Sequence, residues 1–98
     1  MAEAQRPQVA IVTGASSGIG RACALAMDAA GMRLVIVGRS RERLETLAPL
    51  LSNEPVVVAG DVADPATTAQ AVERALESFG WLDILLANAG LYLPDRGW

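Results

Sequence analysis

Apolar residues gather in four short runs along the chain, and longer stretches of mixed polarity separate one run from the next. Short apolar runs rich in β-branched residues are typical of strands that are buried on both faces of a sheet. We therefore expect strands at residues 9–13, 32–37, 55–59 and 82–87.

The stretch after the first strand predicts a helix over residues 18–30. Apolar positions recur there every three or four residues, which is the spacing of one helical face. Gly31 follows where a C-terminal cap is expected. We interpret Cys23 as a small core side chain; the alternative is a reactive thiol near a ligand. The predicted buried face consists of Ile19, Ala22, Cys23, Ala26 and Ala30.

A second helix is expected to begin at Ser40, whose hydroxyl suits an N-cap, and Pro49 should kink or end it. Its buried side chains are predicted to be Leu44, Leu47 and Leu51.

The third helix has equally clear ends. Asp64 is the expected N-cap, Pro65 the first helical residue and Gly80 the C-terminal stop. Its apolar face is predicted to contain Ala69, Val72, Ala75, Leu76 and Phe79.

Alternating strands and helices predict an α/β fold with a doubly wound parallel sheet of the Rossmann type. The expected strand order is 3-2-1-4, with the first two helices on one face and the third on the other. Ligands bind such sheets beyond the carboxyl ends of the strands, where the strand order reverses, here between strands one and four. The length suits one domain, residues 1–98, with a short disordered lead-in at residues 1–8.

Three glycines follow the first strand directly: Gly14, Gly18 and Gly20. A strand, a glycine-rich turn and a helix present backbone N–H groups and the positive end of a helix dipole to a phosphate. The first glycine permits a tight exit from the strand, the second a close approach to a pyrophosphate, and the third close packing of the helix. Ser16 and Ser17 add hydroxyl donors. An ordinary tight connection is the alternative.

Composition excludes several kinds of site and partner. A hydrophobic content of 52%, a charged content of 19% and a net charge of −3 favour a globular protein and argue against a nucleic-acid surface. The chain has no lysine, no histidine and one cysteine, so zinc ligands, an imidazole base and an internal disulfide are not expected. No signal segment or membrane-spanning run is recognisable, and we expect a soluble, cytoplasmic protein.

The octet from Thr13 to Gly20 closely resembles the cofactor-binding turn of the short-chain dehydrogenase/reductase family. Three further segments resemble motifs of that family in the same order: Gly38-Arg39-Ser40, Asp61-Val62 and Asn88-Ala89-Gly90. Together with the octet, they extend over nearly the whole chain. The resemblance implies that the turn binds a nicotinamide dinucleotide through Gly14, Ser16, Ser17, Gly18, Ile19 and Gly20.

The end of the second strand favours NADP over NAD. An acidic residue at this place usually binds the adenosine ribose and favours NAD, whereas this chain has Gly38 followed by Arg39. The Arg39 guanidinium can pair with a 2′-phosphate and stack on adenine, and Ser40 can add a hydroxyl. A solvated surface arginine is the alternative interpretation.

The resemblance implies roles for the two remaining segments. Asp61, followed by Val62, would accept a hydrogen bond from the adenine amino group; a turn aspartate is the alternative. In the segment Asn88-Ala89-Gly90, Ala87 stands where the family has a first asparagine. Gly90 would leave room beside the nicotinamide ribose, and Asn88 would tie the strand to its neighbours.

Members of this family transfer hydride between a nicotinamide cofactor and an alcohol or carbonyl, and a Tyr-x-x-x-Lys motif supplies the acid/base. Without a lysine, the 98 residues cannot contain that motif. Tyr92 and Arg96 have the spacing, but Pro94 between them excludes a shared helical face. We therefore assign no catalytic residue and expect the front portion of a longer, homo-oligomeric enzyme.

Two other hypotheses remain open: a protein that binds NADP without catalysis, and an inactive fragment. A methyltransferase also has a glycine-rich turn after its first strand, but it would need an acidic residue where Gly38 and Arg39 stand. Tight NADPH binding without dehydrogenase activity would support the binding protein. No thermal shift with nucleotide would support the fragment.

Overall fold

The computed structural model describes residues 6–16 and 18–87. In chain order, its elements are β1 (Val9–Thr13), α2 (Gly18–Ala29), β2 (Arg33–Gly38), α3 (Arg41–Leu47), a single 3₁₀ turn η1 (Ala48–Leu50), β3 (Val56–Ala59), α4 (Pro65–Phe79) and β4 (Ile84–Ala87). Each predicted strand and helix is present, with ends that differ by at most two residues except at the second helix. There, the segment with Pro49 tightens into η1 after α3 ends.

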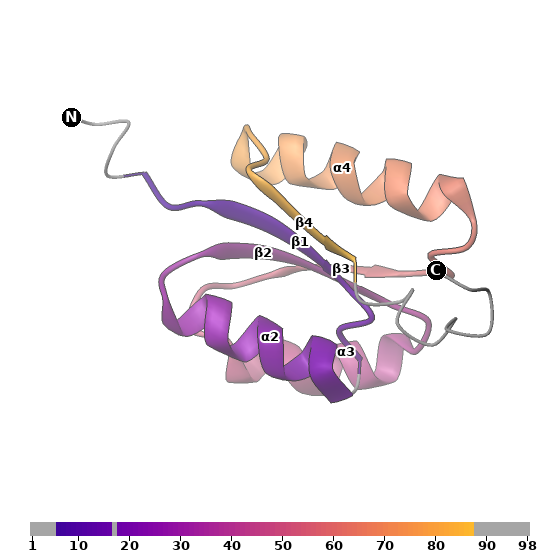
Figure 1. Ribbon diagram of the computed structural model, residues 1–98, viewed down its shortest axis with the longest axis horizontal. Helices are drawn as coiled ribbons and strands as arrows, with labels where there is room; N and C mark the ends of the chain where they lie inside the picture. Colours follow the sequence, from indigo (N-terminus) through magenta and orange to yellow (C-terminus); the bar gives the residue numbers. More distant parts are fainter. Residues whose placement is uncertain (1–5, 17, 88–98) are drawn as a thin grey trace, which may run out of the picture.

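The strands form one parallel sheet in the order β3-β2-β1-β4, as the sequence predicts (Figure 1). In the centre of the sheet, Ile11 of β1 lies opposite Val35 of β2 on one side and Leu85 of β4 on the other. β1 and β2 are buried almost throughout, because helices cover both of their faces. The fold is therefore α/β and Rossmann-like.

Two cores lie on opposite faces of the sheet. Helices α2 and α3 cover one face and α4 covers the other, as Figure 1 shows. Alternate residues of β1 serve the two sides: Ala10 and Val12 point toward α2 and α3, whereas Val9 and Ile11 point toward α4. The sequence predicts this distribution of the helices, two on one face and one on the other.

Local signals in the sequence set the helix ends as predicted. The Ser40 side chain accepts a hydrogen bond from the backbone N–H of Arg43 at 3.2 Å and caps α3. Asp64 caps α4 by accepting from the N–H of Ala66 at 3.0 Å. Gly80 ends α4 in the left-handed region, at φ 92°, where a side chain would be strained.

Helix α2 packs through a different face from the one that its apolar periodicity predicts, so that part of the prediction is wrong. Ile19 is 65% exposed and Cys23 is half-buried. The cause is steric, because a Cβ on Gly20 would overlap the backbone of Gly14, and this glycine must therefore face the turn. The exposed members of the predicted face are Ile19, Ala22, Ala26 and Ala30, and the residues buried instead are Gly20, Ala24 and Asp28.

Helix α4 also buries a face that differs from the predicted one, but by less than in α2. Ala75 is buried and Val72 and Phe79 pack at the margin of the core, as predicted, but Leu76 is 49% exposed. Ala69 is also exposed, and the central contacts are made by Thr67 and Ala71. Small residues let the helix lie close to the sheet, so the larger apolar side chains move to its flanks.

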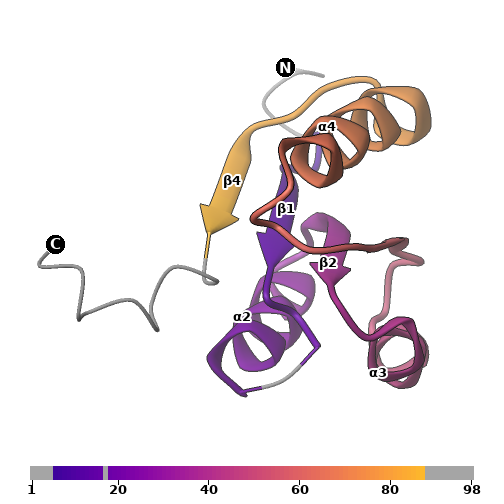
Figure 2. The same cartoon turned by 90° about the vertical axis from the view of Figure 1, so that its right-hand side faces the viewer.

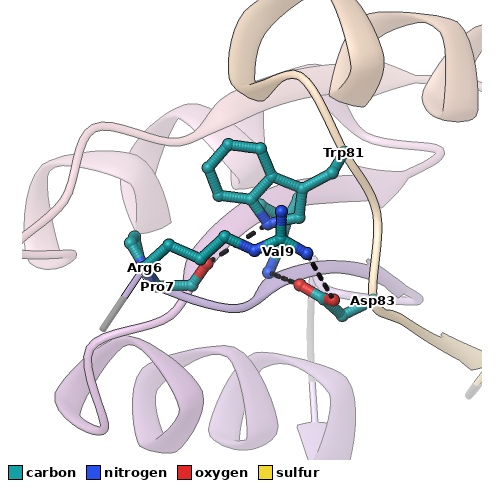
Figure 3. A network of polar contacts seen from close by, with 5 residues as sticks. All are labelled: Arg6, Pro7, Val9, Trp81 and Asp83. Carbon is teal, nitrogen blue, oxygen red and sulfur yellow. Dashed lines mark hydrogen bonds and ion pairs between the residues drawn. The ribbon is translucent and has the colours of Figure 1, made fainter. Parts of the chain in front are cut away.

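Residues 6–8 are not a disordered lead-in, contrary to the prediction; residues 1–5 lie outside the described part. Arg6 lies over the ring of Trp81, with Cζ 4.4 Å from the ring centroid, and forms an ion pair of 3.8 Å with Asp83 (Figure 3). The indole N–H of Trp81 donates to the carbonyl of Pro7 at 3.3 Å. These contacts fix the residues before β1 to the segment that precedes β4.

A buried aspartate that the sequence reading did not single out joins α2 to the segment after η1. Asp28 is 6% exposed and accepts hydrogen bonds from the backbone N–H groups of Ser52, at 2.7 Å, and Asn53, at 3.0 Å. Burial alone would raise the pKa of Asp28, but these hydrogen bonds outweigh it and hold the pKa below its usual value. Over residues 6–16 and 18–87, no helix is long and apolar enough to cross a membrane.

Candidate functional site

The glycine-rich turn connects β1 to α2 through backbone conformations that favour glycine. Gly14 has φ 66° and Gly18 has φ 59°, both in the left-handed region. Gly20 is required for a different reason: an added Cβ would lie 2.6 Å from the carbonyl carbon of Gly14. Two of the three glycines therefore serve the path of the turn, and the third serves its contact with the helix.

The turn lies at the carboxyl ends of the strands, beside both neighbours of β1. Its Ala15 N–H donates to the carbonyl of Val37, in β2, at 2.9 Å. On the other side, the Thr13 hydroxyl donates to the carbonyl of Leu86, in β4, at 3.3 Å. In Figure 2 the arrowheads of β1, β2 and β4 point the same way, and the turn into α2 lies beyond the tip of β1. The turn thus occupies the predicted point where the strand order reverses.

The N-terminus of α2 opens at this edge of the sheet. The first N–H groups of a helix have no partner within the helix and carry its positive partial charge. The first turn of α2 contains no acidic residue that would oppose an anion. Gly18 and Ile19, in this first turn, are exposed. The geometry therefore suits a phosphate group.

Beside the turn, the end of β2 brings Gly38 against Ser16. An added Cβ at Gly38 would lie 2.9 Å from the Ser16 Oγ and 3.1 Å from its Cβ. Arg39 follows and is exposed, and among the residues that the structure describes no carboxylate forms an ion pair with it. Ser40 uses its oxygen as the cap of α3, which leaves its hydroxyl proton available to a ligand.

The end of β3 reaches the same edge. The Gly60 N–H donates to the Gly38 carbonyl at 2.9 Å, which joins the tips of β2 and β3. Asp61 is exposed, and its Oδ1 accepts from the N–H of Ala63 at 2.9 Å, as expected of a turn aspartate. Val62 packs against the core under α4. The structure thus brings the first three predicted segments to one edge of the sheet.

Four predicted site residues lie outside the described part of the chain: Ser17, Asn88, Ala89 and Gly90. Two residues of this edge were given no role by sequence reasoning. Thr13 links β1 to β4, and Gly60 leaves no space for a Cβ, which would lie 2.7 Å from the Thr67 Oγ1. The signal for Gly60 was present, because a glycine directly follows or ends each of the first three strands. Within residues 6–16 and 18–87, no group of three or more His, Cys, Asp or Glu side chains is placed to hold a metal ion.

Comparison with known proteins identifies the family of this chain. The family model of short chain dehydrogenases matches residues 8–97. A dehydrogenase/reductase SDR family member 7B of Mus musculus is 44% identical over 93 residues, which are 88% of this chain and 29% of that protein. An uncharacterized oxidoreductase of Staphylococcus aureus is 39% identical over 90 residues, which are 91% of this chain and 39% of that protein.

Among solved structures, the L-sorbose reductase of Gluconobacter frateurii, complexed with NADPH and L-sorbose, superimposes with a TM-score of 0.80. It is 41% identical, and the match covers 86% of this chain and 34% of the reductase. This chain therefore spans about a third of the length of the relatives that it matches. Since the family model matches nearly all of its residues, the chain belongs to the short chain dehydrogenase family of NAD(P)-dependent oxidoreductases.

Proposed function

We propose that residues 1–98 form one dinucleotide-binding unit that holds NADP(H) for hydride transfer to or from an alcohol or carbonyl substrate. The observation that carries the proposal is the glycine-rich turn at the N-terminus of α2, located at the carboxyl ends of β1 and its two neighbours. This is the arrangement in which Rossmann-type sheets bind the pyrophosphate of a dinucleotide.

The pyrophosphate would contact backbone rather than side chains. Gly18 has open space where a Cβ would stand, so a phosphate can approach its main chain. The N–H groups at the start of α2, where Gly18 and Ile19 are exposed, would donate hydrogen bonds, and the hydroxyls of Ser16 and Ser17 would add to them. Gly14, Ile19 and Gly20 complete the turn.

The adenosine end supports NADP rather than NAD. Gly38 places no negative charge where the 2′-phosphate would bind, and Arg39 offers an unpaired guanidinium among the described residues. Ser40 retains a hydroxyl proton for the same phosphate. The relative from Gluconobacter frateurii was solved with NADPH. Charge-assisted bonds to Arg39 would therefore decide the preference.

Further contacts would complete the cofactor site. Asp61 would accept a hydrogen bond from adenine beside Val62, and Asn88, Ala89 and Gly90 would border the nicotinamide ribose. When bound, the nicotinamide supplies or accepts the hydride, while this chain's residues bind and orient it. The lone Cys23, with no second cysteine to pair with, supports a reducing compartment such as the cytoplasm, and we include homo-oligomeric assembly of the whole protein in the proposal.

Calorimetric titration with NADPH and with NADH tests the proposal. We expect NADPH to bind more tightly, and Arg39→Ala to weaken NADPH about tenfold or more while NADH binding stays within about twofold. Arg41→Ala is the matched control: Arg41 lies two residues further on, is exposed and pairs with Glu45 at 3.9 Å. Equal loss in both variants, or no binding of either nucleotide by the native protein, would contradict the proposal.

A second outcome remains relevant because this chain contains no lysine for a Tyr-x-x-x-Lys motif. A protein that binds NADPH without turning over substrate would show the same titration. An assay of NADPH oxidation with a panel of ketones and aldehydes separates the two functions. Turnover supports the oxidoreductase, and tight binding without turnover supports the binding protein.

A further inference from the structure

We propose that Ser16 determines which residues position 38 can accept, so that Ser16 and Gly38 act as a coupled pair in selecting NADP over NAD. The inference rests on the proposed function, because it concerns the adenosine end of that site. Its basis is a contact: a Cβ at Gly38 would lie 2.9 Å from the Oγ of Ser16, 3.1 Å from its Cβ and 3.4 Å from Cδ2 of Leu44.

The direction of any side chain at position 38 is fixed by β2. Leu34 and Ile36 point into the core under α2 and α3, and position 38, two residues further along the strand, shares their face. Gly38 is itself buried. A side chain there would therefore enter the space that Ser16 and Leu44 already fill, and it could not turn away to solvent.

The neighbours of this contact are held in place. Ala15, next to Ser16, donates its N–H to the carbonyl of Val37, and the Gly38 carbonyl accepts the N–H of Gly60, both at 2.9 Å. Leu44 is fully buried in α3. Rotation of the Ser16 hydroxyl would relieve the 2.9 Å contact but would leave the 3.1 Å contact with its Cβ. That second contact requires the turn to move by a few tenths of an ångström, or a smaller residue at position 16.

This contact changes which substitutions are expected to convert the cofactor preference from NADP to NAD. A carboxylate at the end of the second strand is the usual partner of the adenosine ribose in NAD-binding proteins. Here, Gly38→Asp alone would repel the 2′-phosphate and also push Ser16 and the turn out of position. The substitution would remove NADPH binding without creating NADH binding. Removing the Ser16 side chain at the same time would give the carboxylate its place.

The experiment compares four proteins by calorimetric titration with NADPH and NADH: the native protein, Gly38→Asp, Ser16→Gly and the double variant. We expect Gly38→Asp to weaken NADPH about tenfold or more and to improve NADH by less than about twofold. The double variant should bind NADH about tenfold or more tightly than Gly38→Asp does. If Gly38→Asp binds NADH as tightly as the double variant, the coupling is overturned.

Thermal unfolding of Gly38→Ala, Ser16→Gly and their combination tests the contact without any nucleotide. We expect Gly38→Ala to lower Tm by about 4 °C or more, and to lower it by less than half as much when Ser16 is already glycine. Equal shifts in both backgrounds would overturn the steric pairing. If the native protein binds neither nucleotide, the proposed function and its selectivity fail together, while the unfolding measurements still decide whether Ser16 blocks position 38.

Discussion

The carboxylate of Asp83 accepts a hydrogen bond from the backbone N–H of Val9 at 2.9 Å, and the Asp83 N–H donates to the Val9 carbonyl at 2.9 Å. The residue thus pairs with β1 through its side chain, as Figure 3 shows, and also through its main chain, just before β4 begins. It also receives Arg6 as an ion-pair partner. The three contacts connect the beginning of the described chain to its last strand.

We predict that Asp83→Ala lowers the free energy of unfolding by about 1–3 kcal/mol, because the N–H of the buried Val9 would lose its acceptor. Urea denaturation, followed by circular dichroism, measures the change. Arg6→Ala is the control: it removes the ion pair of a side chain that is 46% exposed, together with its contact with the Trp81 ring, and we expect a loss of about 1 kcal/mol or less. Equal losses would show that the contacts of Arg6, rather than the hydrogen bond to Val9, stabilise this end of the sheet.

We expect Gly20→Ala to be among the most damaging small substitutions in the turn. The added methyl group would overlap backbone of Gly14, which has no flexible end to move, so the loss should reach about 3 kcal/mol or leave the protein unfolded. Gly80→Ala tests backbone strain alone, since nothing lies within 4 Å of its Cβ position and φ is 92°. It should lose only about 1–2 kcal/mol by the same urea assay. A Gly20 variant as stable as the Gly80 variant would refute the close contact.

Asp28 predicts a pH dependence of stability. Its folded-state pKa is lowered by the hydrogen bonds from Ser52 and Asn53, so its stabilising contribution is present above the usual aspartate range, about pH 4. The contribution is lost as the pH falls through the lower, folded-state pKa. We expect Asp28→Asn to be less stable than the native protein at pH 7 and to approach it at acid pH. Urea midpoints at several pH values measure this, and a difference that does not change with pH would contradict it; Glu45→Gln, at an exposed site, serves as the control.

The two roles of Ser40 are separable by substitution. Ser40→Ala should lose about 1 kcal/mol of stability, because the N–H of Arg43 loses its cap, and should also weaken NADPH binding. Ser40→Asp keeps an acceptor for the cap but introduces a negative charge beside the proposed 2′-phosphate site. We therefore expect native-like Tm with NADPH binding reduced about tenfold or more. An aspartate variant that binds NADPH normally would remove Ser40 from the site.

Much of the fold was predictable because its signals are local. The composition of each strand is a local signal. So are the N-caps Ser40 and Asp64 and the C-terminal stop Gly80, and the structure confirms these three helix ends. The faces of α2 and α4 depend instead on long-range packing. Ile19 satisfies the helical spacing of a buried residue, yet it is exposed because Gly20 must contact the turn.

The candidate site divides in the same way. The glycine turn, Arg39 and Asp61 were recognisable from residue type and place after a strand. The contact of Gly38 with Ser16 joins residues 22 positions apart, and the role of Gly60 depends on Thr67 in another element. Spacing along the chain gives no distance between such pairs, so these contacts required the packed structure.

The hydrogen bonds that join the strand tips have a thermodynamic consequence. The bonds from Ala15 to Val37 and from Gly60 to Gly38 join main-chain groups of the protein itself, so they form as the chain folds. The backbone entropy at these positions is therefore lost on folding, and it is not lost a second time when a nucleotide binds. Such preorganisation lets a modest set of polar contacts give useful affinity, since little of their free energy is spent on ordering these main-chain segments.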